Sequence, residues 1–211
     1  MIKEFEKRLL SSIILIPISI FFIIKGSIFF IFFLSIIFLA TSYEWVKMSK
    51  KNDLVKFFGV IFLFLSFYTA FEIRQNFNFK DFLFIIIVCI FTDIGGYIFG
   101  KTFNGPKLTR ISPKKTYAGV FGGFLLSLVA GLLFNHYLVI DEEIFKDDLI
   151  LFILILFISL VSQIGDLIIS FFKRKAKIKD TGKIIPGHGG LLDRIDGMIF
   201  VFPICYLISI S

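Results

Sequence analysis

Residues 149–172 read LILFILILFISLVSQIGDLIISFF, an almost unbroken run of apolar side chains. A helix of that length would be about 36 Å long, which exceeds the roughly 30 Å hydrocarbon core of a bilayer. Six further apolar stretches occur along the chain, at residues 9–24, 27–43, 54–71, 82–100, 118–138 and 191–209. We therefore expect an all-α integral membrane protein, a polytopic bundle of about seven transmembrane helices.

The composition excludes other classes of protein. The chain has 211 residues, including 31 Phe, and it is 57% hydrophobic and 18% charged, with a mean hydropathy of +0.90. Soluble domains are roughly 45–50% apolar and about 25% charged, so an ordinary soluble domain, a disordered chain and a disulfide scaffold are excluded. Cys89 and Cys205 lie in apolar runs, and no Cys/His cluster indicates a zinc site. No small-residue cleavage site closes the first apolar run, so we expect a retained first helix.

The basic residues predict the orientation. With the N-terminus inside, the N-terminal tail and the loops at 44–56, 101–117 and 173–190 hold 18 of the 23 Lys and Arg residues, whereas the opposite side holds four. Cytoplasmic loops are enriched in Lys and Arg, so we expect a cytoplasmic N-terminus. The net charge of +7 is mostly this topology signal and does not argue for nucleic acid. The acidic segment 141–148 then falls outside, and Tyr-Glu-Trp at 43–45 would form an interfacial belt.

Four carboxylates lie within or at the ends of the predicted spans: Asp93, Asp166, Asp193 and Asp196. Each would cost roughly 2.5–3.5 kcal/mol at the bilayer centre, so such residues are candidates for function. Asp93 and Asp166 fall about 10–12 Å from the cytoplasmic ends of their helices, and the other two lie in the first turns of the last span. Three helices thus bring acids to one level. The structural alternative is a set of internal ion pairs, with Arg194 as one partner.

This arrangement suits chemistry at phosphorus. Clustered carboxylate oxygens bind Mg²⁺, and flanking Lys and Arg side chains hold phosphate oxygens. Metal ions can bridge phosphates and stabilise the charge of an in-line displacement. An ion or phosphate transporter is the alternative outside the enzymes, because acids within a membrane also mark ion paths. Transporters more often show inverted repeats or broken helices near the midplane, and no repeat is visible in this sequence.

The two most basic loops contain further groups that could bind anions. In the first, Ser112 and Thr116 offer hydroxyls and Lys114 and Lys115 offer ammonium groups, while Thr116 could instead cap the following helix. No Walker-type motif is present, so this loop is not a P-loop. In the second, Pro-Gly-His-Gly-Gly at 186–190 precedes an acidic helix start whose free amides could receive an anion. Contact with anionic lipid head groups is the simpler alternative for such basic loops.

Residues 170–196 carry the pattern S-x2-K-R-x4-K-D-x-G-x2-I-P-G-H-G-G-x2-D-R-x-D. This pattern resembles the signature of the phosphatidate cytidylyltransferase (CDP-diacylglycerol synthase) family, and every fixed position is matched. Two further blocks are similar to that family. One is Asp-Ile-Gly-Gly-Tyr at 93–97 with Ser-Pro-Lys-Lys-Thr at 112–116, and the other is Ser-Gln-x-Gly-Asp at 162–166. Ala118 stands where the family commonly has Glu, and the chain is shorter than typical members, which have more N-terminal spans.

The resemblance implies a nucleotidyltransferase of phospholipid biosynthesis that makes CDP-diacylglycerol and pyrophosphate from CTP and phosphatidate. The phosphate oxygen of phosphatidate would attack the α-phosphorus of CTP without a covalent protein nucleophile, so the protein's tasks are positioning and charge neutralisation. We expect a multi-pass protein of the cell (inner) membrane with its active site facing the cytoplasm. A CTP-dependent lipid kinase, which would attack the γ-phosphorus, is the alternative among enzymes. The helix motif of CDP-alcohol phosphotransferases is missing.

The same resemblance implies roles for individual residues. Asp166 and Asp193 would bind Mg²⁺, with or without a second cation such as K⁺, and Asp196 and Asp93 are second choices as ligands or nucleotide contacts. His188 would bind phosphate or help the leaving group, with a purely structural histidine as the alternative. The catalytic candidates are Asp166, Asp193, Asp196, Lys173 and His188. The substrate-binding candidates are Asp93, Ser112, Lys114, Lys115, Thr116, Arg174, Lys179, Asp180, Gly189, Gly190 and Arg194.

The chain divides into two predicted regions. We expect residues 1–90 to form N-terminal transmembrane helices that face lipid or a second copy of the chain. Residues 91–211 would form the catalytic transmembrane region, with its two cytoplasmic basic loops at 101–117 and 173–190. The expected partners are CTP, phosphatidate and membrane lipids, with a homodimer as a further candidate and without nucleic acid.

Overall fold

The computed structural model describes residues 2–103, 105–109, 112, 114–138 and 147–209. Its helices are α1 (Ile2–Lys25), α2 (Ser27–Met48), α3 (Asp53–Asn76), α4 (Phe79–Phe103), α5 (Tyr117–Leu138), α6 (Asp148–Lys175), α7 (Leu192–Ile195) and α8 (Met198–Ser209). Each of the seven apolar stretches becomes helical, and the described residues contain no β-strand, so the all-α class is confirmed. Most of the acidic segment, 141–146, and residues Arg110 and Pro113 of the first basic loop lie outside the described residues.

Within the described residues, the five helices α2 to α6 are long and apolar enough to cross a membrane. Helix α1 contributes the shorter apolar stretch Leu9–Lys25. Together they make a multi-pass membrane protein. The last predicted span differs from the prediction, because it divides into α7 and α8. Helix α8 has 12 residues, so it is about 18 Å long and shorter than the hydrocarbon core. The number of crossings therefore stays a prediction.

The division of the last span has a local cause at Gly197. Its backbone lies so close to α6 that an added Cβ would overlap the Ser162 hydroxyl. The preceding Asp193 and Asp196 turn toward Lys173 of α6. The acidic start of the segment is thereby paired within the protein, and the apolar α8 continues beyond it.

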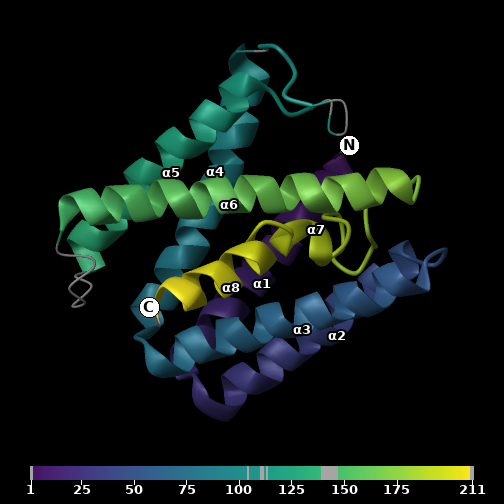
Figure 1. The fold of residues 1–211 in the computed structure, drawn as a ribbon, viewed down its shortest axis with the longest axis horizontal. Helices are drawn as coiled ribbons and strands as arrows, with labels where there is room; N and C mark the ends of the chain where they lie inside the picture. The colour runs from purple at the N-terminus through teal and green to yellow at the C-terminus, as the bar shows by residue number, and fades with distance from the viewer. Residues whose placement is uncertain (1, 104, 110–111, 113, 139–146, 210–211) are drawn as a thin grey trace.

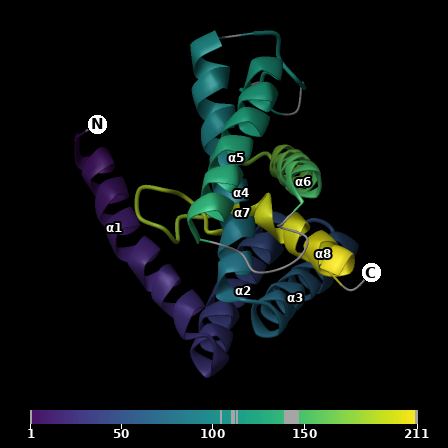
Figure 2. The ribbon, with the colours of Figure 1, turned by 90° about the vertical axis from the view of Figure 1, so that its left-hand side faces the viewer.

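The helices form two groups joined by α6 and α8. Helices α4 and α5 make a long mutual contact, and α4 crosses behind α6 before the two rise together above it (Figure 1). Helices α2 and α3 pair below, and α8 packs against both α3 and α6. Helix α1 stands apart along its length and meets α2 at their shared turn (Figure 2). The loop that follows α6 reaches from the core toward α1 (Figure 2). The predicted division near residue 90 stays a prediction.

The surface and core are as expected for a protein in lipid. The described chain exposes large apolar side chains along its long helices, such as Ile28 at 73% and Leu54 at 69%. Its apolar core is small by comparison and is centred on Phe30, Phe84 and Ile155. Exposed apolar area of this extent marks a surface that meets lipid or other apolar partners.

The interfacial belt predicted at 43–45 is wrong for two of its three residues. Tyr43 is exposed, but Glu44 and Trp45 are buried, with 1% and 6% of their surface accessible. The Trp45 indole Nε1 donates to the Val55 carbonyl at 3.0 Å, and its ring meets Phe172 of α6 edge to face. The end of α2 is therefore covered by its neighbours and faces residues 176–192, which follow α6 and are called the signature loop below.

Candidate active site

The first basic loop folds back on itself before α5. The Leu108 amide donates to the Lys115 carbonyl at 2.8 Å, and Lys107 and Thr116 form an isolated bridge pair. Thr116 Oγ1 accepts from the Gly119 amide at 3.1 Å, which confirms the predicted cap of α5. This closure directs the Lys115 side chain across to α6.

The second basic loop is closed by the Pro-Gly-His-Gly turn. Ile185 and Gly189 pair across it, and the His188 amide donates to the Ile185 carbonyl at 3.0 Å. Gly187 and Gly189 have φ values of 76° and 95°, a region that L-side chains rarely adopt. Glycine at these two positions lets the chain reverse and enter α7.

The two loops and helices α4, α5 and α6 enclose a polar cavity of about 410 Å³. Most of the predicted site residues line it. These are Asp93, Ser112, Lys114, Lys115, Thr116, Asp166, Lys173, Asp180, Asp193, Arg194 and Asp196. The cavity therefore combines acidic groups from three helical segments with lysines from both sides, as the sequence predicts.

Asp166 is the carboxylate that faces this cavity with an ion-pair partner from the first loop. Its Oδ2 lies 2.6 Å from Lys115 Nζ, and the Ser170 hydroxyl donates to Oδ1 at 3.2 Å. About a quarter of the Asp166 side chain remains accessible. Asp93 lines the same cavity from α4 without a hydrogen bond or ion pair to the described residues. Two carboxylates are thus available to cationic ligands.

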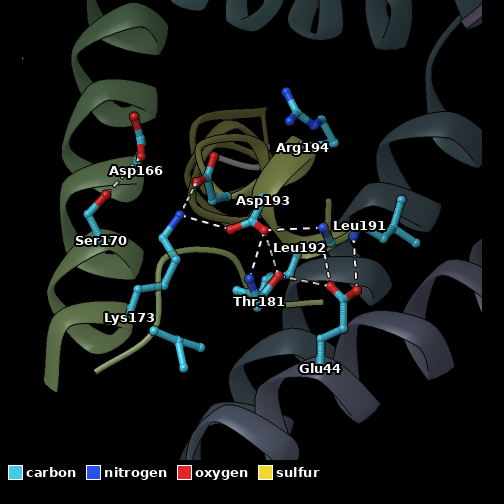
Figure 3. Close-up of polar contacts among 12 residues, drawn as sticks. Glu44, Asp166, Ser170, Lys173, Thr181, Leu191, Leu192, Asp193 and Arg194 are labelled. Carbon is cyan, nitrogen blue, oxygen red and sulfur yellow. Dashed lines mark hydrogen bonds and ion pairs between the residues drawn. The ribbon is translucent and has the colours of Figure 1, made fainter. Parts of the chain in front are cut away.

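Lys173 is a buried ammonium group held between two acids. Its Nζ lies 2.9 Å from Asp193 Oδ1 (Figure 3). It also lies 3.6 Å from Asp196 Oδ2. The lysine and both acids have about a tenth of their side-chain surface accessible. A charged group buried to this extent needs partners of opposite charge. The Lys173 ammonium group has two, Asp193 and Asp196. Asp193 and Asp196, three residues apart, therefore present the same face to Lys173.

Both carboxylate oxygens of Asp193 contact donor groups of the protein itself. Oδ2 accepts from the Thr181 amide at 2.8 Å, and the Thr181 hydroxyl lies 3.0 Å from it (Figure 3). Oδ2 also accepts from the Gly190 amide at 3.2 Å. Oδ1 accepts from Lys173. Both oxygens are occupied by donors, so the geometry gives Asp193 the task of holding the loop and Lys173.

A divalent cation is chemically compatible with the remaining acids. Asp93, Asp166 and Asp196 line the same cavity. Carboxylate oxygens are the ligands that Mg²⁺ prefers. The described residues contain no group of three acidic, His or Cys side chains already gathered as a metal site. Among the candidate acids, Asp166 and Asp93 are accessible to an ion, whereas Asp193 has no oxygen free and Asp196 is equally buried beside Lys173.

Comparison with known proteins identifies the family. Residues 54–211 match the model of the cytidylyltransferase family. The chain belongs to this cytidylyltransferase family. It is 36% identical over 207 residues to a phosphatidate cytidylyltransferase of Rickettsia bellii, covering 96% of this chain and 89% of the relative. It is 33% identical over 212 residues to that of Rickettsia felis, covering 96% and 91%. A phosphatidate cytidylyltransferase of Staphylococcus epidermidis is 36% identical over 154 residues, which are 72% of this chain and 57% of the relative.

Several site residues predicted for this cytidylyltransferase do not line the cavity. His188 lies beside α1, with Nδ1 2.8 Å from the Ser11 hydroxyl and Nε2 3.4 Å from that of Ser12. These contacts support a structural role for His188, the alternative to phosphate binding or help to the leaving group. Arg174 is exposed and donates to the Ile178 carbonyl at 3.3 Å, and Lys179 is exposed.

The two glycines act through their backbone, and the Arg194 side chain contacts the backbone of the turn. Gly189 completes the turn of the second loop, and the Gly190 amide binds Asp193. Arg194 lines the cavity, but its guanidinium donates to the His188 carbonyl, so its predicted pairing with a carboxylate is not seen among the described residues. The peptide oxygen of the turn satisfies this guanidinium in place of an acid.

Glu44 and Thr181 support the site through Asp193 and are not among the residues predicted from the sequence. Thr181 occupies an unspecified position of the signature, and Glu44 comes from α2, far from the motifs. An acid at the end of an apolar run is the same signal that singled out the four aspartates. Applied to the second span, that signal would have found Glu44.

Proposed function

We propose that this protein is a phosphatidate cytidylyltransferase, which transfers the cytidylyl group of CTP to phosphatidate and releases pyrophosphate. The observation that carries the proposal is the polar cavity, where Lys114, Lys115 and Lys173 face Asp93 and Asp166. Ammonium groups bind the oxygens of phosphates, and acids at the same place suit a divalent cation. The family and the names of its relatives supply the substrates, CTP and phosphatidate.

The proposed reaction is a displacement at phosphorus. A phosphate oxygen of phosphatidate forms a bond to the α-phosphorus of CTP, and the bond from that phosphorus to the bridging oxygen of pyrophosphate breaks with its electron pair. The attacking oxygen is already anionic, so the chain supplies no covalent nucleophile. Lys114 and Lys115 on one wall and Lys173 on the other hold the phosphates in line and offset their charge. Ser112 and Thr116 add hydroxyls at the first wall.

The metal assignment is part of the proposal. Asp166, Asp196 and Asp93 would hold Mg²⁺, with or without a second cation such as K⁺. A bound Mg²⁺ offsets negative charge on the phosphate oxygens. Asp193 supports this set by fixing Lys173, and Asp180 lines the rim of the cavity. Arg174, Lys179 and His188 remain proposed outer contacts for phosphate.

The cellular setting follows from the same features. The relatives are bacterial proteins, and five apolar helices of this chain are long enough to span a membrane. We place the cavity on the cytoplasmic side of the bacterial inner membrane, where CTP is available and where the basic loops are expected. Phosphatidate would enter from the surrounding lipid. A homodimer stays a prediction.

Product analysis tests the proposal. Purified protein in detergent–lipid micelles would receive CTP, phosphatidate and Mg²⁺, and the products would be separated by charge. We expect equal amounts of CDP-diacylglycerol and pyrophosphate. Asp166→Asn should lower the rate about 100-fold or more, because it removes charge at the reacting phosphates. EDTA should abolish turnover if the metal assignment holds.

The control replaces an acid remote from the cavity. Asp53→Asn affects an exposed carboxylate that pairs with Lys56 at the start of α3, so it should leave the rate unchanged. CDP with a phosphorylated lipid would mean a lipid kinase. Ion flux in vesicles without CTP turnover would mean a transporter. Either outcome would overturn the proposed reaction.

A further inference from the structure

Glu44 of α2 is a buried acid that the proposed reaction does not use. Only 1% of its surface is accessible, and it forms no ion pair with a Lys or Arg of the described residues. It also precedes residues 54–211, the part that the family model matches. A buried carboxylate must be met by donors, so the groups around it indicate its role.

Its donors all come from the signature loop. Glu44 Oε1 accepts from the Leu191 amide at 3.1 Å, and Oε2 accepts from the Leu192 amide at 2.8 Å. The Thr181 hydroxyl lies 3.0 Å from Oε2 (Figure 3). Thr181 and Leu192 are the two ends of the segment that contains the Pro-Gly-His-Gly-Gly turn. One carboxylate therefore ties both ends of this segment to α2.

The fit between Glu44 and the loop depends on two glycines. A Cβ added at Gly182 would overlap Glu44 Oε1. A Cβ added at Gly190 would overlap the Thr181 hydroxyl and lie 2.8 Å from Glu44 Oε2. Both glycines belong to the signature pattern, and their missing side chains leave the space that the carboxylate fills. The loop is thus shaped to receive an acid from α2.

The anchored loop leads directly to the charged groups of the cavity. The Thr181 hydroxyl lies 3.0 Å from Asp193 Oδ2 as well as from Glu44, and the Thr181 and Gly190 amides also bind Asp193. Asp193 in turn holds Lys173. A continuous series of contacts therefore connects Glu44 on α2, through Thr181 and Asp193, to Lys173 at the cavity.

We propose that Glu44 is a positioning residue for cytidylyl transfer. It fixes the signature loop so that Asp193 keeps the Lys173 ammonium group at the cavity. This inference rests on the proposed function, since the readout is turnover. Because Glu44 lies on α2, outside residues 54–211 that match the family model, the inference gives the N-terminal helices a part in the site.

The test uses two substitutions that preserve the size of the side chain. The carboxylate offers two acceptor oxygens to two successive amides, whereas glutamine offers one, because its amide group is a donor. Glu44→Met offers none. We expect Glu44→Gln to lower kcat about 10-fold and Glu44→Met about 100-fold, the range seen when supporting groups around a site are removed. The KM for phosphatidate should change little, because Glu44 touches no substrate.

A second measurement separates positioning from general stability. Amide hydrogen exchange in the full chain should become faster in residues 181–192 of both variants, while exchange elsewhere stays as in the parent. The matched control is Thr41→Val, one turn earlier on α2. Thr41 is fully buried, but its hydroxyl bonds to Ile37 and Phe38 of its own helix. That variant should keep the parent kcat and loop exchange.

Each outcome decides the inference. If Glu44→Met keeps the parent kcat, Glu44 is merely structural. The same conclusion follows if the variant lowers the melting temperature of the whole protein but leaves kcat of the folded fraction unchanged. If Glu44→Met does not fold, Glu44→Gln carries the test by the same two measurements. If the parent makes no CDP-diacylglycerol, the proposed function fails, while loop exchange still decides whether Glu44 anchors the loop.

Discussion

Asp166 and Asp193 carry the same side chain in opposite surroundings. Asp166 meets Lys115 and Ser170 and keeps about a quarter of its surface open to the cavity. Asp193 accepts from the Lys173 ammonium group and from two loop amides, lies 3.0 Å from the Thr181 hydroxyl, and is nearly enclosed. An accessible acid is free to bind a ligand, whereas a saturated acid shapes the protein around it.

These surroundings predict different consequences for the same substitution. Asp193→Asn should lower the free energy of unfolding by about 1–3 kcal/mol, because the new amide group would face N–H donors of the loop or the Lys173 ammonium group. Asp166→Asn should leave the free energy of unfolding nearly unchanged. Denaturation in mixed detergent micelles would measure both variants. Equal destabilisation by the two would contradict the division of roles.

Helices α4 and α5 show how an element positions the site. The backbones touch, since a Cβ added at Gly95 would overlap the carbonyl oxygen of Gly122. Gly95 lies two residues after Asp93, and α5 begins directly after the loop that carries Lys115. The close approach of these helices therefore sets the width of the cavity between its acidic and basic walls.

A pair of alanine substitutions tests this packing. Gly95→Ala should destabilise the protein by about 1–3 kcal/mol and lower turnover, because a backbone carbonyl cannot move aside cheaply. Gly96→Ala is the matched control. There the nearest atom to an added Cβ is the Gly119 carbonyl oxygen at 3.7 Å, an ordinary contact, so the free energy of unfolding should stay near the parent. Thermal unfolding would measure both variants, the CTP assay would measure Gly95→Ala, and equal destabilisation would refute the packing argument.

At the scale of the whole molecule, the ends of α4 and α6 and both basic loops gather around the cavity. The turn after α3 lies at the other end of that helix from the signature loop (Figure 1). Basic loops favour the cytoplasm, and both basic loops lie at the cavity. The orientation of the bundle in the membrane therefore decides from which compartment the cavity receives its nucleotide.

Cysteine labelling in vesicles tests the orientation. Lys177→Cys, in the second basic loop, should react with an impermeant maleimide only when the cytoplasmic face is outward. Gln75→Cys, at the end of α3, should react only from the opposite face. Both positions are exposed, and the native Cys89 is buried. Labelling of both sites from one face would contradict the proposed topology.

The extent of sequence-based prediction differs between fold and site. Apolar length predicted all seven helical stretches, and intramembrane acids predicted most of the cavity, because both signals arise from the cost of placing groups in lipid. The roles of His188 and Arg194 could not be predicted in this way. Their partners are the Ser11 hydroxyl and the His188 carbonyl, groups whose proximity depends on how α1 and the loop pack.

The sequence by itself determined the helices, the membrane setting and the family, because hydropathy and motif spacing are properties of the chain alone. Tertiary structure decided which acid is open, which is saturated, and that Glu44 anchors the signature loop from a distance of 137 residues. It also divided the last apolar stretch at Gly197. The physical reason is common to these cases: a buried polar group is defined by the donors and acceptors that packing brings to it, and these come from distant parts of the chain.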